Sequence, residues 1–167
     1  MQRMDLKELI RKACENDLSV IADLAKVVRG NMVLSGLEQW VGDYPNIDNF
    51  RKDYLNDGLF VLVLDEEIIG SCSILKENDV AYKEVLWTGV NALVVHRILV
   101  SPKHQGKGYG KDLLIYALEK AKLEGYDAVK IDTHPDNIKM QRMLKSMGFS
   151  FKGYLASINR LAFEKMV

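Results

Sequence analysis

The 167-residue sequence is poor in the residues that small secreted domains use for crosslinks, since it contains two cysteines and three prolines. A disulfide-stabilised scaffold carries more cysteines, so we interpret Cys14 and Cys72 as free thiols in a reducing compartment, small core residues rather than nucleophiles. Neither charge sign dominates, because 23 basic side chains balance 23 acidic ones. This balance gives no indication of a nucleic acid or a membrane surface as a partner.

Long hydrophobic runs are also missing from the sequence. No unbroken apolar stretch exceeds six residues, the length of the run at 59–64, whereas a membrane-spanning helix needs about 20. The first five residues do not begin the apolar core of a signal peptide. These features predict a cytoplasmic protein. The length fits a single domain over residues 1–167, in which 48% hydrophobic residues are enough to build a core.

Apolar periodicity indicates helices first, then strands, and then an alternating unit. Helical spacing predicts helices over residues 15–29, 37–44 and 47–55, a helix that ends at Gly125, and one over 137–147. β-Rich runs predict strands over residues 6–11, 59–64, 68–75, 90–100, 128–132, 149–155 and 161–167. This order favours a mixed α/β sandwich around one sheet.

Three glycines at every second position, Gly106, Gly108 and Gly110, lie between the strand predicted over 90–100 and the next helix. Glycine leaves the backbone bare, so peptide N–H groups can approach a phosphate closely. A helix that begins here adds the unpaired N–H groups of its first turn and the positive end of its dipole. Lys107 and Lys111 add positive charge. The segment is therefore suited to bind a pyrophosphate.

Other phosphate-binding loops fit this spacing less well. Asp112 stands after Lys111, where a P-loop has the Ser or Thr that binds magnesium. The third glycine comes one residue too early for the dinucleotide fingerprint Gly-x-Gly-x-x-Gly. The remaining alternative is a tight strand-to-helix turn that needs glycine only for its backbone geometry.

At these residues the sequence resembles the GNAT superfamily of N-acetyltransferases, whose cofactor motif is Gln/Arg-x-x-Gly-x-Gly/Ala after a strand that ends near Val-x-Pro. Gln105, Gly108 and Gly110 fit this motif behind Val100-Ser101-Pro102. A second segment, residues 137–149, is similar to the family's later helix, which begins at an Asn and ends in Gly-Phe. The family's fold implies an α/β (α+β) protein with a mixed, mostly antiparallel central sheet flanked by helices on both faces.

The resemblance implies an acyltransferase that passes the acetyl group of acetyl-CoA to a primary amine by direct attack in a ternary complex. The amides of residues 106–111 would hold the pyrophosphate. The backbone of residues 98–100 would pair with the pantetheine arm, with one N–H facing the thioester oxygen. Asn137 would contact the cofactor arm, and a plain helix cap is the alternative for it. The cofactor-binding residues predicted in this way are Ile98, Leu99, Val100, Gln105, Gly106, Lys107, Gly108, Tyr109, Gly110, Lys111 and Asn137.

One position departs from the family's pattern. Many members carry a tyrosine in the later helix, often assigned as the acid that protonates the departing thiolate, and Leu144 stands at the aligned position. Leucine cannot donate a proton. A non-catalytic module that binds or senses acyl-CoA is therefore the alternative function. A further alternative is a protein that binds another nucleotide through residues 105–111, called the glycine segment below.

Transfer to an amine requires a base, because a lysine-like amine with a pKa of about 10.4 is protonated at neutral pH. His96, near the cofactor-binding end of the central strand, is the first candidate, with a packed sheet histidine as the alternative. Glu84 is the second candidate, with a solvated loop carboxylate as its alternative. Trp40, Tyr44 and Trp87 are candidates to line an acceptor pocket, although aromatic side chains are more often part of a core.

The histidines and cysteines show no metal-ligand spacing, so no metal is predicted. His134 is expected in a turn or near the cofactor arm, and His104 is expected to be exposed beside the glycine segment. The expected acceptor is a small-molecule amine or a peptide. A homodimer formed through the sheet edge or the last strands is a further expectation.

Overall fold

The computed structural model describes Asp5 and residues 9–167. Within that part of the chain, strands form one sheet in the order β1-β2-β3-β4-β5-β7-β6. All neighbouring strands are antiparallel except β4 and β5, which run parallel. The predicted mostly antiparallel sheet is confirmed. The strands are β1 (Ile10–Lys12), β2 (Leu59–Leu64), β3 (Glu67–Lys76), β4 (Ala92–Val100), β5 (Ala128–Thr133), β6 (Ser150–Leu155) and β7 (Arg160–Met166).

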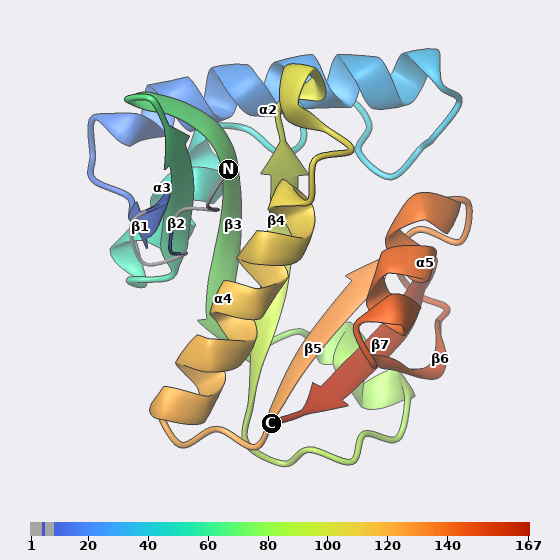
Figure 1. The fold of residues 1–167 in the computed structure, drawn as a ribbon. Coiled ribbons are helices and arrows are strands. Elements are labelled where there is room, and N and C mark those ends of the chain that lie inside the picture. Colours follow the sequence, from blue (N-terminus) through green and yellow to red (C-terminus); the bar gives the residue numbers. More distant parts are fainter. Residues whose placement is uncertain (1–4, 6–8) are drawn as a thin grey trace.

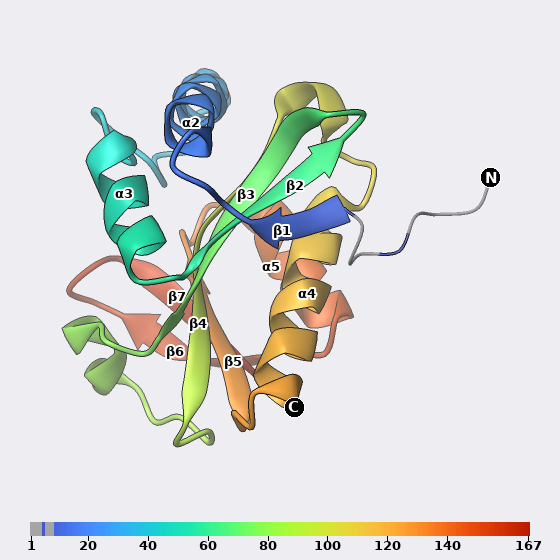
Figure 2. The ribbon, with the colours of Figure 1, turned by 90° about the vertical axis from the view of Figure 1, so that its left-hand side faces the viewer.

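Helices cover both faces of this sheet, as Figures 1 and 2 show. Helices α2 (Asp17–Leu34) and α3 (Ile47–Leu55) lie on one face, and α4 (Tyr109–Leu123) and α5 (Ile138–Ser146) lie on the other. Two short 3₁₀ helices, η1 (Val80–Glu84) and η2 (Pro102–His104), precede and follow β4. Separate clusters of buried apolar side chains fill the two layers. The predicted arrangement of helices around a central sheet is therefore also confirmed.

Local signals explain where several of these elements begin and end. The side chain of Asn46 caps α3 by accepting hydrogen bonds from the amides of Asp48 and Asn49, at 3.0 and 3.4 Å. The turn between β2 and β3 places Asp65 and Glu66 in the left-handed region, which suits a tight hairpin. Helix α3 and the β2–β3 hairpin consequently match the predicted ranges closely.

One predicted helix needs correction, and Cys14, expected to be a small core residue, is exposed. The helix predicted over residues 37–44 does not form, because this segment is an irregular loop whose Trp40 is packed in the core under α2 and α3. Tertiary contacts of the loop take the place of helical hydrogen bonds. In the described part of the chain the first strand is Ile10–Lys12, and residues 6–8 of its predicted range lie outside that part.

Strands β4 and β5 pair along only part of their lengths. Their register runs from Ala92↔Ala128 to Val95↔Ile131. Beyond these pairs β4 continues along β3 and β5 continues along β7, so the two strands separate toward the upper end of Figure 1. The point of separation is called the fork below. The last pair before it is Val95↔Ile131, so His96 and Asp132 are the first residues beyond it on the two strands.

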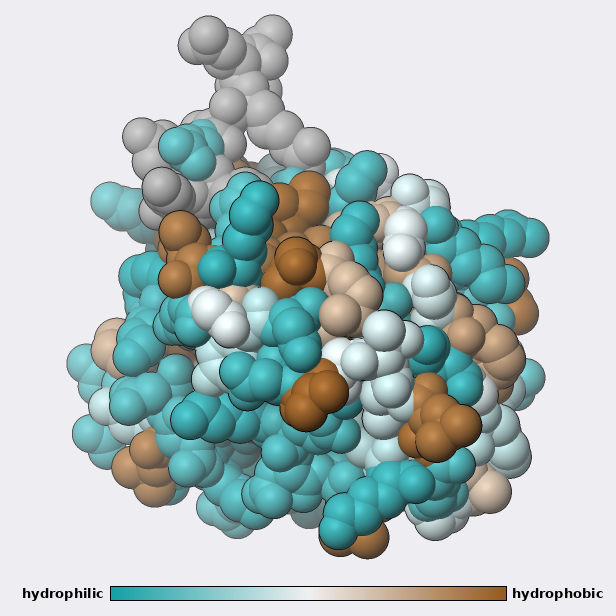
Figure 3. All heavy atoms as spheres, turned by 90° about the horizontal axis from the view of Figure 1, so that it is seen from below, coloured by the Kyte–Doolittle hydropathy of each residue, from teal (hydrophilic) through white to brown (hydrophobic). Residues whose placement is uncertain are grey.

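The opposite, lower end of the molecule presents mainly hydrophilic side chains, with hydrophobic ones in small separate groups (Figure 3). Among the described residues, this face therefore offers no broad apolar patch of the kind that marks large protein interfaces. Among the described helices, none combines the length and the apolar character that crossing a bilayer requires.

Candidate functional site

The glycine segment joins β4 to α4, as the sequence predicts. Gly106 and Gly108 take left-handed φ angles of 77° and 87°, and Gly108 is the N-cap of α4. A residue with a Cβ rarely adopts such angles, which explains the need for glycine here. The side-chain amide of Gln105 donates to the carbonyl of Val100 at 3.1 Å. Gln105 therefore fastens the segment to the end of β4.

The start of α4 offers hydrogen-bond donors. The Asp112 N–H donates to the Gly108 carbonyl at 3.0 Å, so the amides of Tyr109, Gly110 and Lys111 precede the first bond of the helix and have no partner within it. A Cβ built on Gly106 would meet no heavy atom within 4 Å, which shows open space beside the segment. Donors, open space and the positive end of the helix dipole fit a pyrophosphate.

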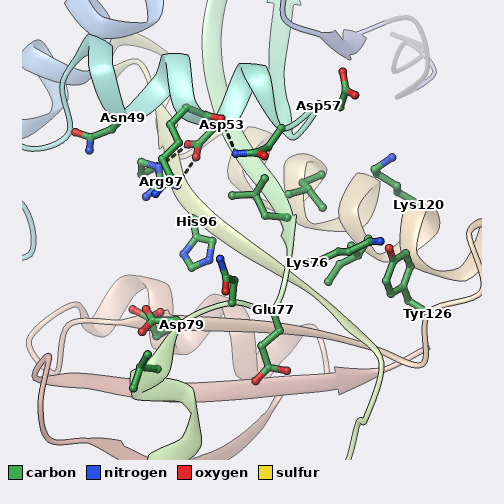
Figure 4. Close-up of a pocket in the computed structure, with 18 of the residues that line it drawn as sticks. Asn49, Asp53, Asp57, Lys76, Glu77, Asp79, His96, Arg97, Lys120 and Tyr126 are labelled. Atoms are coloured by element: carbon green, nitrogen blue, oxygen red, sulfur yellow. Dashed lines mark hydrogen bonds and ion pairs between the residues drawn. The ribbon is translucent and has the colours of Figure 1, made fainter.

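A cavity of about 1180 Å³ lies on the side of the sheet that carries α3 and η1 (Figure 4). It extends from the fork past β3 to the C-terminal end of α4. Of the described residues 105–111, none lines it, so the cavity and the glycine segment are separate regions that β4 connects. The side chains that line it near the fork include Tyr44, Asp53, Asp79, His96, Arg97, Asp132 and Arg160.

His96 is half-buried at the fork and faces this cavity (Figure 4). Within the described part of the chain, its imidazole has no hydrogen-bond partner, and its ring centroid lies 6.4 Å from that of Tyr82. Burial, followed by the charge of Arg97, lowers the pKa of His96 below 6.5, although Asp132 acts in the opposite direction. The imidazole is therefore neutral at pH 7 and able to accept a proton.

Asp132 lies on the other branch of the fork. The Tyr82 hydroxyl donates to its Oδ2 at 2.7 Å, and Nε of Arg160 lies 3.9 Å from its Oδ1. Burial raises the pKa of Asp132, against the lowering effect of the Tyr82 hydrogen bond. The fork thus combines a neutral imidazole with a carboxyl group whose proton affinity is increased.

A β-bulge interrupts β4 directly after His96. Ser73 pairs with His96 whereas Ser71 pairs with Leu99, so β4 contains one extra residue here. Arg97 lies in the bulge with φ of 49°, and its guanidinium donates twice to Asp53, at 2.6 and 2.7 Å. His96 and Arg97 both line the cavity, which consecutive residues of a regular strand cannot do.

Glu84 does not line the cavity that His96 faces. It is exposed at the end of η1 and accepts hydrogen bonds from the hydroxyl and the amide of Ser157, the latter at 3.1 Å. These hydrogen bonds lower the pKa of its carboxyl group. The structure therefore does not bring the two candidate bases together.

Only one of the three aromatic candidates lines the cavity. Tyr44 does so, and its hydroxyl accepts a hydrogen bond from Arg97 at 3.1 Å. Trp40 is 4% exposed and belongs to the core under α2 and α3. Trp87 packs on Tyr82 and donates to the Tyr82 carbonyl at 2.6 Å. The core alternative holds for both tryptophans.

Asn137 acts as the cap of α5. Its Oδ1 accepts from the Met140 amide at 3.1 Å, and its Nδ2 donates to Gln39 at 2.9 Å. The cap alternative is therefore present, and a contact with the cofactor arm stays a prediction. Leu144 is completely buried in the core between the sheet and the helices α4 and α5.

The two other histidines also lie outside the cavity. His134 is buried in the turn after β5, where its Nδ1 accepts from the Asp136 amide at 3.0 Å. The prediction that His104 is exposed is wrong, because its ring is half-buried and packs against Tyr109. In the described residues, no group of three or more His, Cys, Asp or Glu side chains is arranged to hold a metal ion.

Asp53, Arg97 and Asp132 were not among the predicted site residues. A charged side chain inside an apolar strand is a signal for Arg97 and Asp132, because such residues are rarely buried unless they are paired. Their partners cannot be read from local spacing, since Asp53 is 44 residues from Arg97 and Tyr82 is 50 residues from Asp132.

Comparison with known proteins agrees with this geometry. A family model described as the acetyltransferase (GNAT) family matches residues 33–149. The structure is similar to the crystal structure of a GNAT-family acetyltransferase from Streptococcus agalactiae, with a TM-score of 0.86 and 26% sequence identity over 95% of this chain and 94% of that chain. No curated protein sequence matches the chain.

Two further structures share the fold. A GNAT-family acetyltransferase from Listeria monocytogenes has a TM-score of 0.79 and 20% identity, with 95% of this chain and 94% of that chain covered. A ribosomal-protein-alanine N-acetyltransferase from Brucella melitensis has a TM-score of 0.67 and 18% identity, with coverages of 95% and 99%. At these identities the likeness concerns the fold alone.

Proposed function

Because the chain belongs to the acetyltransferase (GNAT) family, we propose that it transfers the acetyl group of acetyl-CoA to a primary amine. The observation that carries the proposal is the fork of β4 and β5. At the fork the neutral imidazole of His96 faces the cavity. Residues 98–100, a few positions further along β4, lead from there to the glycine segment. Such a site can bring an amine and a thioester together from two sides.

Acetyl-CoA, when bound, supplies an activated acetyl thioester. The amides of Gly106, Lys107, Gly108, Tyr109, Gly110 and Lys111 would hold its pyrophosphate, helped by the two exposed lysines of the segment. The backbone of Ile98, Leu99 and Val100 would pair with its pantetheine arm, because β4 pairs with β5 only as far as Val95. Gln105 would support the segment from the end of β4.

The acceptor reaches the cavity as an ammonium ion. Near His96 the carboxylates of Asp79 and Asp132 attract such a cation, while the guanidinium of Arg160, 3.9 Å from Asp132, acts against it. His96 removes a proton from this ammonium, and the free amine then forms a bond to the acetyl carbon. A backbone N–H near Ile98 or Leu99 stabilises the negative charge that develops on the carbonyl oxygen. The carbon–sulfur bond breaks, and the new amide loses its second proton to solvent.

The leaving thiolate needs no protein acid in this proposal. Leu144 has no proton to donate and lies in the core. The thiolate of a thiol with a pKa of about 8.5 is a weaker base than an amine whose conjugate acid has a pKa of about 10.4. It can therefore leave as the anion and take its proton from water. The direct attack in a ternary complex therefore proceeds with His96 as the principal proton acceptor.

The acceptor is proposed to be a small-molecule amine or a peptide. The cavity is larger than the roughly 300–1,000 Å³ of usual small-ligand pockets, and the Brucella melitensis relative is named for an alanine of ribosomal proteins. A peptide N-terminus is therefore one acceptor to test beside small amines. A cytoplasmic location, a homodimer, and the absence of nucleic-acid and membrane partners also belong to the proposal.

A non-catalytic module that binds or senses acyl-CoA is the second candidate function. The observation that favours it is Leu144, which occupies the position of a frequent family tyrosine and is completely buried. Such a module would retain the glycine segment and would bind CoA without turnover.

The test is a panel of small amines and peptides with acetyl-CoA, in which the release of free CoA thiol is followed. Amine-dependent thiol release that His96→Ala strongly reduces supports the transferase. Binding of acetyl-CoA by calorimetry without release for any acceptor supports the sensing module. Failure of the wild-type protein to bind acetyl-CoA or CoA contradicts both candidates.

A further inference from the structure

The apolar pattern of β4 does not by itself determine where the extra residue of the bulge lies. Before the bulge, Val95 packs toward α4 and α5, and Val94 packs on the opposite face. After the bulge, Ile98 packs toward α4 and α5, and Leu99 packs under α2 and α3. Because both faces are apolar, a slip by one residue would exchange one apolar set for another at small cost.

Arg97 is the residue that distinguishes the registers. Its φ of 49° lies in the left-handed region, which residues other than glycine avoid. Its guanidinium is held by Asp53, whose side chain is 3% exposed, through Nε and Nη2 at 2.6 and 2.7 Å. Any other position of the bulge would move this guanidinium away from a buried carboxylate, which is costly.

Asp53 also contacts the neighbouring strand. Its Oδ2 accepts a hydrogen bond from the hydroxyl of Ser73 in β3 at 2.5 Å, and Ser73 is the residue that pairs with His96. One buried side chain of α3 therefore binds both strands at the site of the bulge. Figure 4 shows Asp53 and Arg97 joined above His96.

We propose that Asp53 is a positioning residue, which fixes the β-bulge of β4 at Arg97 and thereby directs His96 into the cavity and the backbone of Ile98 toward the cofactor arm. The bulge places His96 and Ile98 on opposite faces of the sheet. Without Asp53 the bulge would move or disappear, and in a regular strand the two residues would lie on the same face. The catalytic meaning of this inference rests on the proposed function, whereas the bulge itself is observable without activity.

The experiment compares Asp53→Asn with two double variants, Asp53→Asn/Arg97→Gly and Asp53→Asn/Arg97→Ala. We expect Asp53→Asn to lower kcat at least about 30-fold and to weaken the binding of CoA, measured by calorimetry, by a smaller factor, since the strand segment that pairs with the arm shifts while the glycine segment that holds the diphosphate is untouched. Glycine adopts the left-handed conformation freely and alanine does not. The glycine double variant is therefore expected to be about tenfold more active than the alanine one.

In Asp53→Asn alone the guanidinium of Arg97 is left without its partner, whereas both double variants lack this guanidinium. A difference in activity between the two double variants therefore reports the backbone conformation at position 97 and not an uncompensated buried charge. Crystal structures of the three variants give this φ directly. A positive φ and a bulge in the glycine variant, with a regular or shifted strand in the other two, supports the proposal. If Asp53→Asn alone fails to fold, the two double variants still decide.

Two results would overturn the proposal: an unshifted bulge with wild-type kcat in Asp53→Asn, or equal activity and equal strand geometry in the two double variants. Absence of transfer by the wild-type protein to every acceptor would refute the proposed function alone. In that case the three crystal structures still determine whether Asp53 fixes the bulge.

Discussion

Asp53 of α3 and Arg97 of β4 form a double ion pair, with nitrogen–oxygen distances of 2.6 and 2.7 Å, on the wall of the cavity that contains His96. The pair is mostly withdrawn from water, since the two side chains are 3% and 16% exposed. Burying both charges is expensive, and the attraction compensates for this only when the geometry is good. We therefore infer that this pair fixes one conformation of β4 more than it adds to net stability.

Removal of one partner of this pair should destabilise the protein strongly. We expect Asp53→Ala to lower the free energy of unfolding by about 3–5 kcal/mol, because Arg97 then keeps a buried charge without its partner. Urea denaturation measures the loss. The control is Glu124→Ala, which removes an ion pair with Lys120 of similar length, 2.7 Å, on the surface. Its expected cost is below about 0.5 kcal/mol, and equal losses would contradict a special role of burial.

The pH dependence of transfer should report His96. Because its pKa is lowered by burial and by the charge of Arg97, the imidazole stays neutral to a lower pH than an ordinary histidine and becomes protonated only at more acidic pH. Because only the neutral form accepts a proton, kcat/KM should be level near pH 7 and should decrease on the acidic side. We expect His96→Gln to lower kcat/KM by about 10²–10⁴-fold and to remove this acidic limb.

Glu84→Gln is the matched control for this experiment, since Glu84 lies outside the cavity and binds Ser157 instead. It should leave kcat/KM and its pH profile unchanged. An acidic limb that survives in His96→Gln, or that disappears in Glu84→Gln, would assign the base to another residue.

Substitution in the glycine segment should separate cofactor binding from stability. Gly108→Val places a branched side chain at a φ of 87° beside the first amides of α4, so we expect the loss of measurable CoA binding in calorimetry. Gly125→Val imposes the same kind of backbone strain, at a φ of 80°, at the other end of α4. Both variants should lose stability, and only Gly108→Val should lose affinity. Unchanged affinity of Gly108→Val would remove the segment from the binding site.

Leu144 should matter for the core and not for proton transfer. Leu144→Ala is expected to cost about 2–5 kcal/mol of stability, whereas the volume-conserving Leu144→Met should cost less than about 1.5 kcal/mol. The pH profile of kcat of Leu144→Met should equal that of the wild-type protein. A changed alkaline limb in this variant would show that the position influences protonation of the leaving thiolate.

The sequence was sufficient for elements whose signals are local. Helix α3 follows from its apolar spacing and the Asp57-Gly58 stop, and the glycine segment follows from three alternating glycines. The loop over residues 37–44 was mispredicted because its contacts are distant. Oε1 of Gln39 accepts hydrogen bonds from Thr133 and Asn137, 94 and 98 residues away, and these override its helical spacing.

The site could be predicted only in part for the same reason. His96 was identified by its residue type and its place on the central strand. The bulge beside it depends on an ion pair between α3 and β4, and no periodicity in β4 reveals an extra residue when both faces of the strand are apolar. Asp132 likewise becomes part of the site only through the parallel register of β4 and β5.

A crystal structure of the protein with bound acetyl-CoA tests the central claim most directly. We predict a diphosphate that accepts hydrogen bonds from the amides of residues 106–111, an arm that runs along Ile98, Leu99 and Val100, and an acetyl carbonyl at the fork beside His96. A diphosphate bound elsewhere, or an acetyl group that does not reach the cavity, would contradict the account.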